Sequence, residues 1–238
     1  VTVDIDSTGM DSLTMYGVLD DGPSHGLAIV SWSEMGYIRA NDTGISNMEL
    51  DGVWIDDEIE LQLVNCDISL NNGWGLYGYQ NLDLNMTESG TGGSQLFNND
   101  MGGLMIDVDS IINIEETDIS QNGGYAILLD DDIIATLDRV MINGNSKGFL
   151  SGTGCDIVFK SSSITQTING VGFEVVESDL VITGSQSMRS SIQNNDGAGL
   201  FVDGGSLSIE YLDVSNNGAD GIKLWGVDLT GIEAATSG

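Results

Sequence analysis

The sequence predicts an all-β protein, a single-stranded right-handed parallel β-helix (solenoid) of about 9–10 coils. Three observations predict this fold: a glycine followed by a short apolar strand recurs along the chain, a second alternating strand follows it, and an asparagine-rich corner closes the repeat. Coils of this kind stack about 4.8 Å apart, which gives a rod of about 45 Å.

The first part of the repeat is a glycine that leads an apolar strand, as in Gly52-Val-Trp-Ile and Gly103-Leu-Met-Ile. Successive glycines are 21 to 28 residues apart, with a mean near 24. A period of this length is typical of solenoids, in which one coil buries too little surface to fold alone. We therefore expect one corner file to contain all of the following glycines: Gly26, Gly52, Gly75, Gly103, Gly124, Gly148, Gly172, Gly199 and Gly221.

The second part is a strand in which apolar and polar residues alternate, as in Ile59–Leu63 and Leu82–Met86. Alternation with a period of two indicates a half-buried strand.

The third part is a corner rich in asparagine, where stacked side-chain amides can form an asparagine ladder. The chain also has five Asn-Gly pairs, which are a strong signal for hairpin turns. Because the asparagine corners recur at one place in a repeat of about 24 residues, a stacked coil explains them better than isolated hairpins.

These residues carry a resemblance. The pattern Asn-Asn-x-x-x-Gly followed by two alternating apolar strands resembles the right-handed parallel β-helix repeat superfamily, the pectate-lyase-like solenoids, from about Ser12 to Thr230. The resemblance implies the fold but not one function, since this superfamily includes lyases, hydrolases, epimerases, tailspikes and adhesins. The ordered catalytic set of its pectin hydrolases is incomplete here, and His25, the one histidine, is expected to be a solvated turn residue without an acidic partner.

Composition excludes several classes of protein. The net charge is −31, and the six basic residues form no cluster, which argues against binding to nucleic acid or to an anionic membrane. No run approaches the roughly 18 apolar residues of a membrane span. The two cysteines, Cys66 and Cys155, fall on different walls of the coil and are expected to be unbonded.

The outward positions of the glycine-led strands are the first candidate site. If the first and third residues after each glycine face the core, the second and fourth face out, yet many of these are apolar or aromatic. An exposed apolar patch marks either a binding site or a surface that another segment covers. The expected ligand-binding residues are Trp54, Tyr77, Tyr79, Met105, Phe201 and Trp225.

Acidic residues after the glycine-led strands are the second candidate site. Those of two neighbouring coils could supply oxygen ligands to Ca²⁺, and the alternative is a charged, solvated edge that resists aggregation. The expected metal-binding residues are Asp107, Asp109, Asp130, Asp131 and Asp132.

The missing catalytic set and the acidity favour an extracellular structural or adhesive segment of a larger cell-surface protein. The expected partners are other segments or copies of that protein, and neutral glycans. The alternative is a polysaccharide-active enzyme or a carbohydrate-binding module that uses Trp54, Tyr77 and Tyr79 with nearby acids such as Asp56. Residues 1–238 are expected to form one domain, a fragment of a longer chain.

Overall fold

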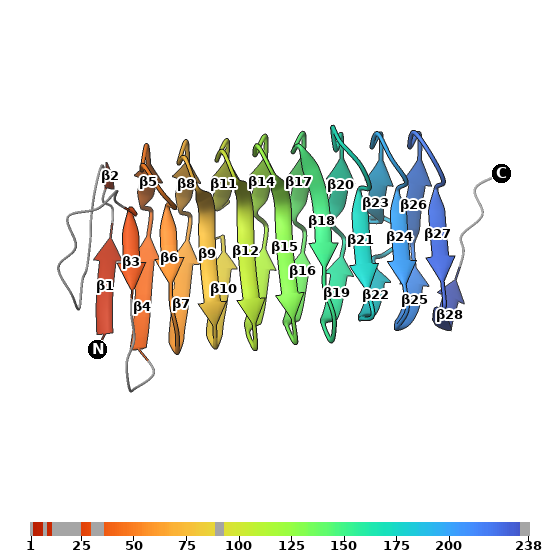
Figure 1. The fold of residues 1–238 in the computed structure, drawn as a ribbon, viewed down its shortest axis with the longest axis horizontal. Coiled ribbons are helices and arrows are strands. Elements are labelled where there is room, and N and C mark those ends of the chain that lie inside the picture. The colour runs from red at the N-terminus through yellow and green to blue at the C-terminus, as the bar shows by residue number, and fades with distance from the viewer. Residues whose placement is uncertain (1, 7–8, 11–24, 30–35, 89–92, 234–238) are drawn as a thin grey trace.

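The chain folds as a right-handed parallel β-solenoid of about 8 turns with about 23 residues per turn (Figure 1). The computed structural model describes residues 2–6, 9–10, 25–29, 36–88 and 93–233; the start of the resembling region, at Ser12, lies outside them. The described residues form no helix, and accordingly none that could cross a membrane. The predicted parallel β-helix is confirmed, because every strand pairing is parallel and links one coil to the next.

Each coil contributes one strand to each of three sheets. Sheet C carries the glycine-led strands: β3 (Leu27–Ile29), β6 (Val53–Ile55), β9 (Trp74–Gln80), β12 (Gly102–Val108), β15 (Tyr125–Asp131), β18 (Lys147–Ser151), β21 (Phe173–Val176), β24 (Leu200–Asp203) and β27 (Ile222–Trp225). Sheet A carries the alternating strands: β1 (Thr2–Asp6), β4 (Gly36–Asn41), β7 (Ile59–Val64), β10 (Leu82–Thr87), β13 (Ile111–Glu115), β16 (Ile134–Asp138), β19 (Asp156–Lys160), β22 (Asp179–Thr183), β25 (Ser206–Glu210) and β28 (Asp228–Glu233). Sheet B carries the short third strands: β2 (Gly9–Met10), β5 (Gly44–Ser46), β8 (Asp67–Ser69), β11 (Gln95–Phe97), β14 (Asp118–Ser120), β17 (Met141–Asn143), β20 (Ser163–Thr165), β23 (Ser190–Gln193) and β26 (Leu212–Ser215).

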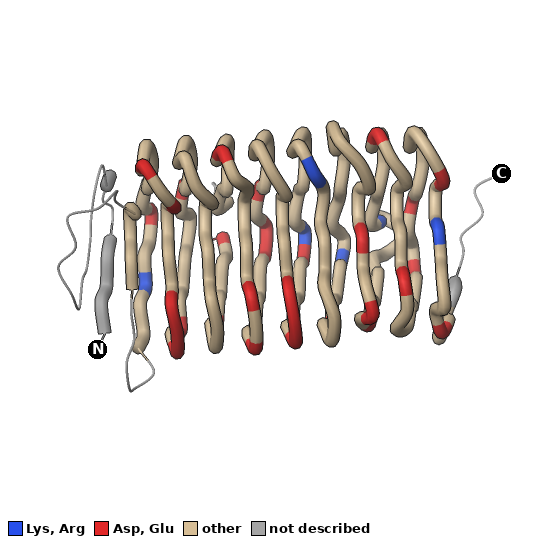
Figure 2. Tube along the Cα trace, in the orientation of Figure 1, with Lys and Arg blue, Asp and Glu red and all other residues tan. Residues whose placement is uncertain are grey.

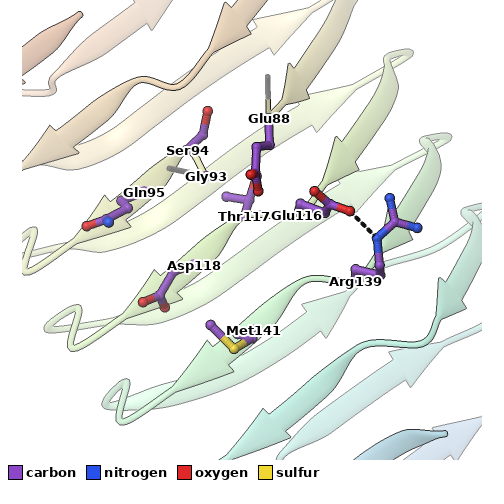
Figure 3. A pocket seen from close by; sticks show the side chains of 9 residues that line it. All are labelled: Glu88, Gly93, Ser94, Gln95, Glu116, Thr117, Asp118, Arg139 and Met141. Atoms are coloured by element: carbon purple, nitrogen blue, oxygen red, sulfur yellow. Dashed lines mark hydrogen bonds and ion pairs between the residues drawn. The ribbon is translucent and has the colours of Figure 1, made fainter. Parts of the chain in front are cut away.

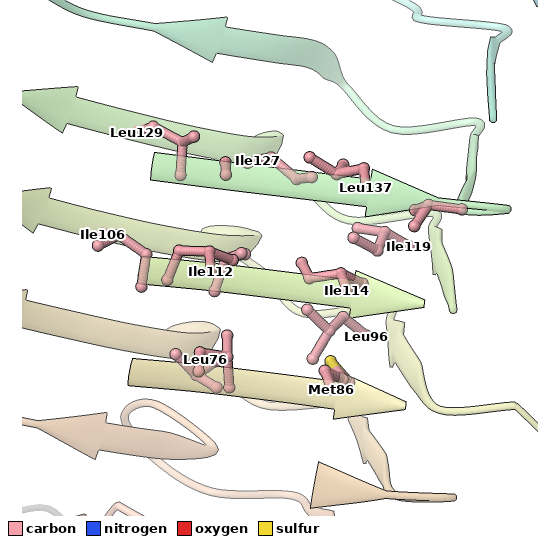
Figure 4. Close-up of a cluster of buried hydrophobic side chains, with 14 of the residues drawn as sticks. Leu76, Met86, Leu96, Ile106, Ile112, Ile114, Ile119, Ile127, Leu129 and Leu137 are labelled. Carbon is pink, nitrogen blue, oxygen red and sulfur yellow. The ribbon is translucent and has the colours of Figure 1, made fainter. Parts of the chain in front are cut away.

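The core is a continuous column of aliphatic and aromatic side chains between the three sheets. Figure 4 shows a part of this column that is built from Leu, Ile and Met side chains. Parallel pairing in register places residues of one kind above one another, as for Leu76, Leu104 and Ile127 in sheet C. Burying each such side chain contributes about 1.5–3 kcal/mol, so the stacking of coils rather than any single coil stabilises the fold.

The corners of the coil have a repeated backbone conformation. In the coil that starts at β12, the corner residues Asp109, Glu116 and Gln121 have φ angles of 50°, 49° and 54°. Left-handed backbone is unfavourable for most side chains but accessible to Asn and Asp, which explains why polar residues occupy these positions in many coils. Each left-handed residue turns the chain and directs the next side chain into the core, as with Ser110, Thr117 and Asn122.

The predicted asparagine ladder is present at the corner between sheets B and C. Asn71 donates to Asn99 at 2.9 Å, Asn99 to Asn122 at 3.1 Å and Asn122 to Asn145 at 2.9 Å, in each case from Nδ2 to Oδ1. Thr167 occupies the next position, and the pattern resumes from Asn195 to Asn217 at 2.9 Å. The ladder satisfies amide groups that burial would otherwise leave without partners.

The prediction that nine glycines form one corner file is wrong at one position. Leu104 pairs with Ile127, so Ala126 and not Gly124 stands above Gly103. The pair Gly123-Gly124 lies just before this position and is followed by apolar residues, so it matches the glycine-led pattern of the repeat. Alanine fits because its methyl group is the smallest side chain, and Ala126 is fully buried.

The prediction about the cysteines is confirmed. Cys66 and Cys155 are both free and buried, at different corners of the coil. Burial raises the pKa of the Cys66 thiol, which keeps it protonated and unreactive.

Candidate functional site

The outer face of sheet C carries a central file of side chains, one from each coil. Alternation along the strands is as expected, because Leu104 and Ile106 are fully buried while Met105 between them is half-buried and faces out. Ala28 on β3 begins the row and is buried. We call the row from β6 onward the outer file, and its members in register are Trp54, Tyr77, Met105, Leu128, Leu150, Glu174, Phe201 and Lys223. Its first five members are uncharged, in a protein whose net charge is −31.

An aromatic cluster lies at the N-terminal end of this face. The rings of Trp54 and His25 stack with their centroids 5.5 Å apart, and Nδ1 of His25 lies 3.3 Å from Oδ2 of Asp51. The expectation that His25 lacks an acidic partner is therefore wrong. Trp74 is buried on the same face, and a methyl group added at Gly102 would lie 2.1 Å from its ring, so the glycine makes room for the indole.

Tyr77 and Asp107 form the polar part of this cluster. The Tyr77 hydroxyl donates a hydrogen bond of 2.6 Å to Oδ2 of Asp107. Burial, together with the Asp107 carboxylate, raises the pKa of the Tyr77 hydroxyl, so it remains a donor at neutral pH. The other oxygen of Asp107 is buried without a hydrogen-bond partner among the described residues. Tyr79, which is 45% exposed, stands beside Asp107 in the adjoining outward row.

A second aromatic cluster lies toward the C-terminal end of the same face. Phe201 and Trp225 meet edge to face at 5.3 Å, and Nζ of Lys223 lies 5.0 Å and 4.3 Å from their ring centroids. Of the six aromatic and apolar residues expected at the site, the structure thus brings Trp54, Tyr77, Tyr79 and Met105 together, while Phe201 and Trp225 form a separate group several coils away.

The five acids expected to bind Ca²⁺ lie on neighbouring coils. Asp107 precedes Val108 on β12 and Asp130 precedes Asp131 on β15, and the pairing of Val108 with Asp131 sets these two coils side by side. Asp109 and Asp132 both occupy left-handed corner positions. Within the part of the chain that the structure describes, however, no group of three or more metal-binding side chains has the geometry to hold an ion. The Ca²⁺ site remains a prediction.

One of these acids, Asp130, has a raised pKa. Partial burial is the larger cause of the raised pKa of Asp130, and the carboxylates of Asp131 and Asp107 add to it. A carboxyl whose pKa is raised on folding binds its proton more tightly in the folded state, so its contribution to stability declines as the pH rises above its ordinary value of 3.8.

Asp130→Asn is therefore expected to raise the melting temperature at pH 7, because it removes a charge that the folded state disfavours. The gain should disappear below pH 3.8, where the native carboxyl is already protonated. Asp67→Asn, an exposed position between Gly44 and Gln95 in sheet B, removes the same charge without the neighbouring acids. An equal gain from both variants would mean that net charge alone, and not the Asp107–Asp130–Asp131 group, is responsible.

Two hollows lie away from sheet C, and sequence reasoning missed both. One, of about 260 Å³, crosses the outer face of sheet A and is lined by the uncharged outward residues Asn85, Asn113 and Thr136 together with Thr87, Ile114, Glu115 and Asp138. Polar but uncharged residues at outward positions of successive alternating strands were the available signal.

The other hollow, of about 310 Å³, lies at the corner between sheets A and B (Figure 3). Arg139 there forms ion pairs with Glu115, Glu116 and Asp138, which raise the pKa of its guanidinium. Desolvation, followed by the hydrogen bond with Glu116, raises the pKa of Glu88. Acidic residues otherwise occur along the whole length of the rod, on strands and corners alike (Figure 2).

Fold and face together define the class of the molecule: an acidic parallel β-solenoid that carries an aromatic and apolar file on the outside of one sheet. Comparison of the chain with protein-family models, with curated proteins and with solved structures finds no match.

Proposed function

We propose that the chain is an extracellular structural or adhesive segment of a larger surface protein, a stiff acidic rod with one ligand-binding face on sheet C. One observation carries the proposal: the outer file is uncharged over five successive coils, from Trp54 to Leu150. Outward aromatic side chains add nothing to the core, and an apolar patch of this kind usually contacts a ligand or another chain.

The charge of the rod restricts its partners. A net charge of −31 repels nucleic acids and polyuronates, so the fitting partners are glycans without negative charge and other segments or copies of the surface protein. We also propose kinship with the pectate-lyase-like solenoids, which is supported by the repeat pattern around the asparagine corners.

Changing both Trp54 and Tyr77 to serine is expected to weaken glycan binding or self-association by about tenfold or more, because both rings belong to the outer file. The fold should survive, since neither side chain is part of the core. Glycan-array binding and sedimentation measure the first effect, and circular dichroism with thermal unfolding measures the second.

The matched control is the double change Ile111→Ser and Ile134→Ser. These neighbours are 47% and 52% exposed on sheet A, so the control removes outward apolar surface from the wrong face. Equal losses in both double variants, or full binding after loss of Trp54 and Tyr77, would overturn the proposal. Unfolding of the Trp54/Tyr77 variant would show that these rings support the core.

A polysaccharide-active enzyme is the second candidate, and the Tyr77–Asp107 pair beside Asp130 favours it. A carboxyl with a raised pKa next to a second carboxylate is the arrangement that glycoside hydrolysis uses. A reducing-sugar assay on the isolated chain, repeated with Asp107→Asn, separates an enzyme from a binding rod.

A further inference from the structure

The chain uses the aromatic rings of sheet C to hold its own ammonium groups. Nζ of Lys147 lies 4.5 Å from the ring centroid of Tyr125, and Lys223 lies over both Phe201 and Trp225. Two of the chain's three lysines are thus placed on this one face, over rings whose negative π surface attracts a cation.

The Trp54–Tyr77 end of the face has the same rings but no such cation. On β6, β9 and β12 the outward residues and the corner residues beside them include neither lysine nor arginine. Carboxylates border the rings instead: Asp51 accepts a hydrogen bond from the Trp74 amide at 2.6 Å, and Asp107 accepts one from Tyr77. Asp56 stands in the outward row beside Tyr79, half-buried.

Asp51 has the His25 imidazole beside it, but among the described residues no lysine, arginine or histidine pairs with Asp56 or Asp107. The ion pairs of Arg139, Lys160 and Arg189 all lie on sheets A and B or at their corner, where they neutralise other acids. A ligand that brings its own positive charge gains both from the rings and from the carboxylates, whereas a neutral ligand gains only from the rings.

We propose that the Trp54–Tyr77 end of sheet C binds a glycan that bears protonated amino groups, an oligomer of the glucosamine type. This inference rests on the proposed function and names the ligand class of its binding face. The apolar face of a sugar ring stacks on an aromatic side chain, and its ammonium group meets the flanking carboxylates. The three neighbouring strands β6, β9 and β12, about 4.8 Å apart, set the rings of Trp54, Tyr77 and Tyr79 between the carboxylates of Asp56 and Asp107. An extended chain that crosses these strands can therefore meet rings and carboxylates together.

Two probes with one backbone test the inference: a glucosamine hexamer and the corresponding N-acetylglucosamine hexamer, which lacks the charge. Isothermal titration at low salt, at a pH where the free amines are protonated, is expected to show about tenfold tighter binding of the free-amine hexamer. The difference should shrink as salt is added, because these groups lie at the surface.

Two variants locate the site. Asp56→Asn is expected to weaken binding of the free-amine hexamer about fivefold, because the carboxylate lies beside the rings. Asp67→Asn, with the same change of charge on sheet B, should leave binding within about twofold. Equal effects of the two variants would show a general attraction to the acidic rod and would overturn the site.

The failure of this inference can be told apart from failure of the proposed function. Equal affinity for both hexamers overturns the amine requirement and leaves a glycan-binding rod. Equal affinity for hexalysine and for the free-amine hexamer overturns the requirement for a sugar and leaves a site that binds amines in general. Binding of neither hexamer overturns the inference, and the Trp54/Tyr77 double variant then decides the proposed function by self-association.

Discussion

Phe173→Ala is expected to lower the free energy of unfolding by about 3–5 kcal/mol. Phe173 is fully buried, stacks on Phe149 with ring centroids 4.5 Å apart and meets Phe159 edge to face at 5.3 Å. The substitution opens a cavity between two coils that the surrounding strands cannot close, because their spacing is set by backbone hydrogen bonds. Denaturant unfolding followed by circular dichroism measures the loss.

Phe201→Ala is the control for this prediction. Phe201 belongs to the next strand of the same sheet but faces outward, over the backbone and not into the core. Its removal is expected to cost less than about 1 kcal/mol. Similar losses at the two positions would mean that the inward and outward files are not distinct.

Asn122→Leu is expected to lower the free energy of unfolding by a similar amount, about 3–5 kcal/mol. Leucine has the same branched arrangement of four side-chain heavy atoms as asparagine, with two bulkier methyl groups in place of the amide oxygen and nitrogen, so the change chiefly removes polar atoms. The change removes the donor to Leu96 O at 3.0 Å and to Asn145 Oδ1 at 2.9 Å, and the acceptor for the Asn99 amide at 2.9 Å. Each buried polar group left without a partner costs about 1–3 kcal/mol.

Asn72→Leu supplies the comparison, since Asn72 is exposed just after the ladder position of Asn71. Its effect should stay within about 0.5 kcal/mol. Hydrogen exchange gives an independent reading: the Asn99 amide should exchange faster in Asn122→Leu than in the native chain. A ladder variant as stable as the Asn72 variant would show that the amides do not support the fold.

Most of the fold could be predicted because stacking forces like residues above one another. A file of leucines and isoleucines, or of asparagines such as Asn99, Asn122 and Asn145, must recur once per coil, and this recurrence is visible in one sequence. The register read from the sequence was wrong in the coil where alanine takes the place of the repeated glycine. Ala126 is small enough for this position, and Gly124 lies two residues before it.

The candidate site was predictable only in part. The outward direction of Trp54, Tyr77 and Met105 could be predicted, because the direction of a side chain in a strand follows from the alternation of its neighbours in the same strand. Contacts such as His25 with Asp51, or Trp74 over Gly102, join different coils, and the corners between the strands vary in length. Counting residues along the sequence therefore does not show which residue of the next coil a corner side chain contacts.

Each coil contacts only the coil before it and the coil after it, which gives the rod a defined response to force. Tension on the two chain ends loads the outermost coils first, so the rod unwinds from its ends one coil at a time. A released coil of about 23 residues adds roughly 80 Å of contour length while the remaining stack stays intact. Such a rod lengthens in regular steps under load and rewinds onto its own remaining coils when the load is removed.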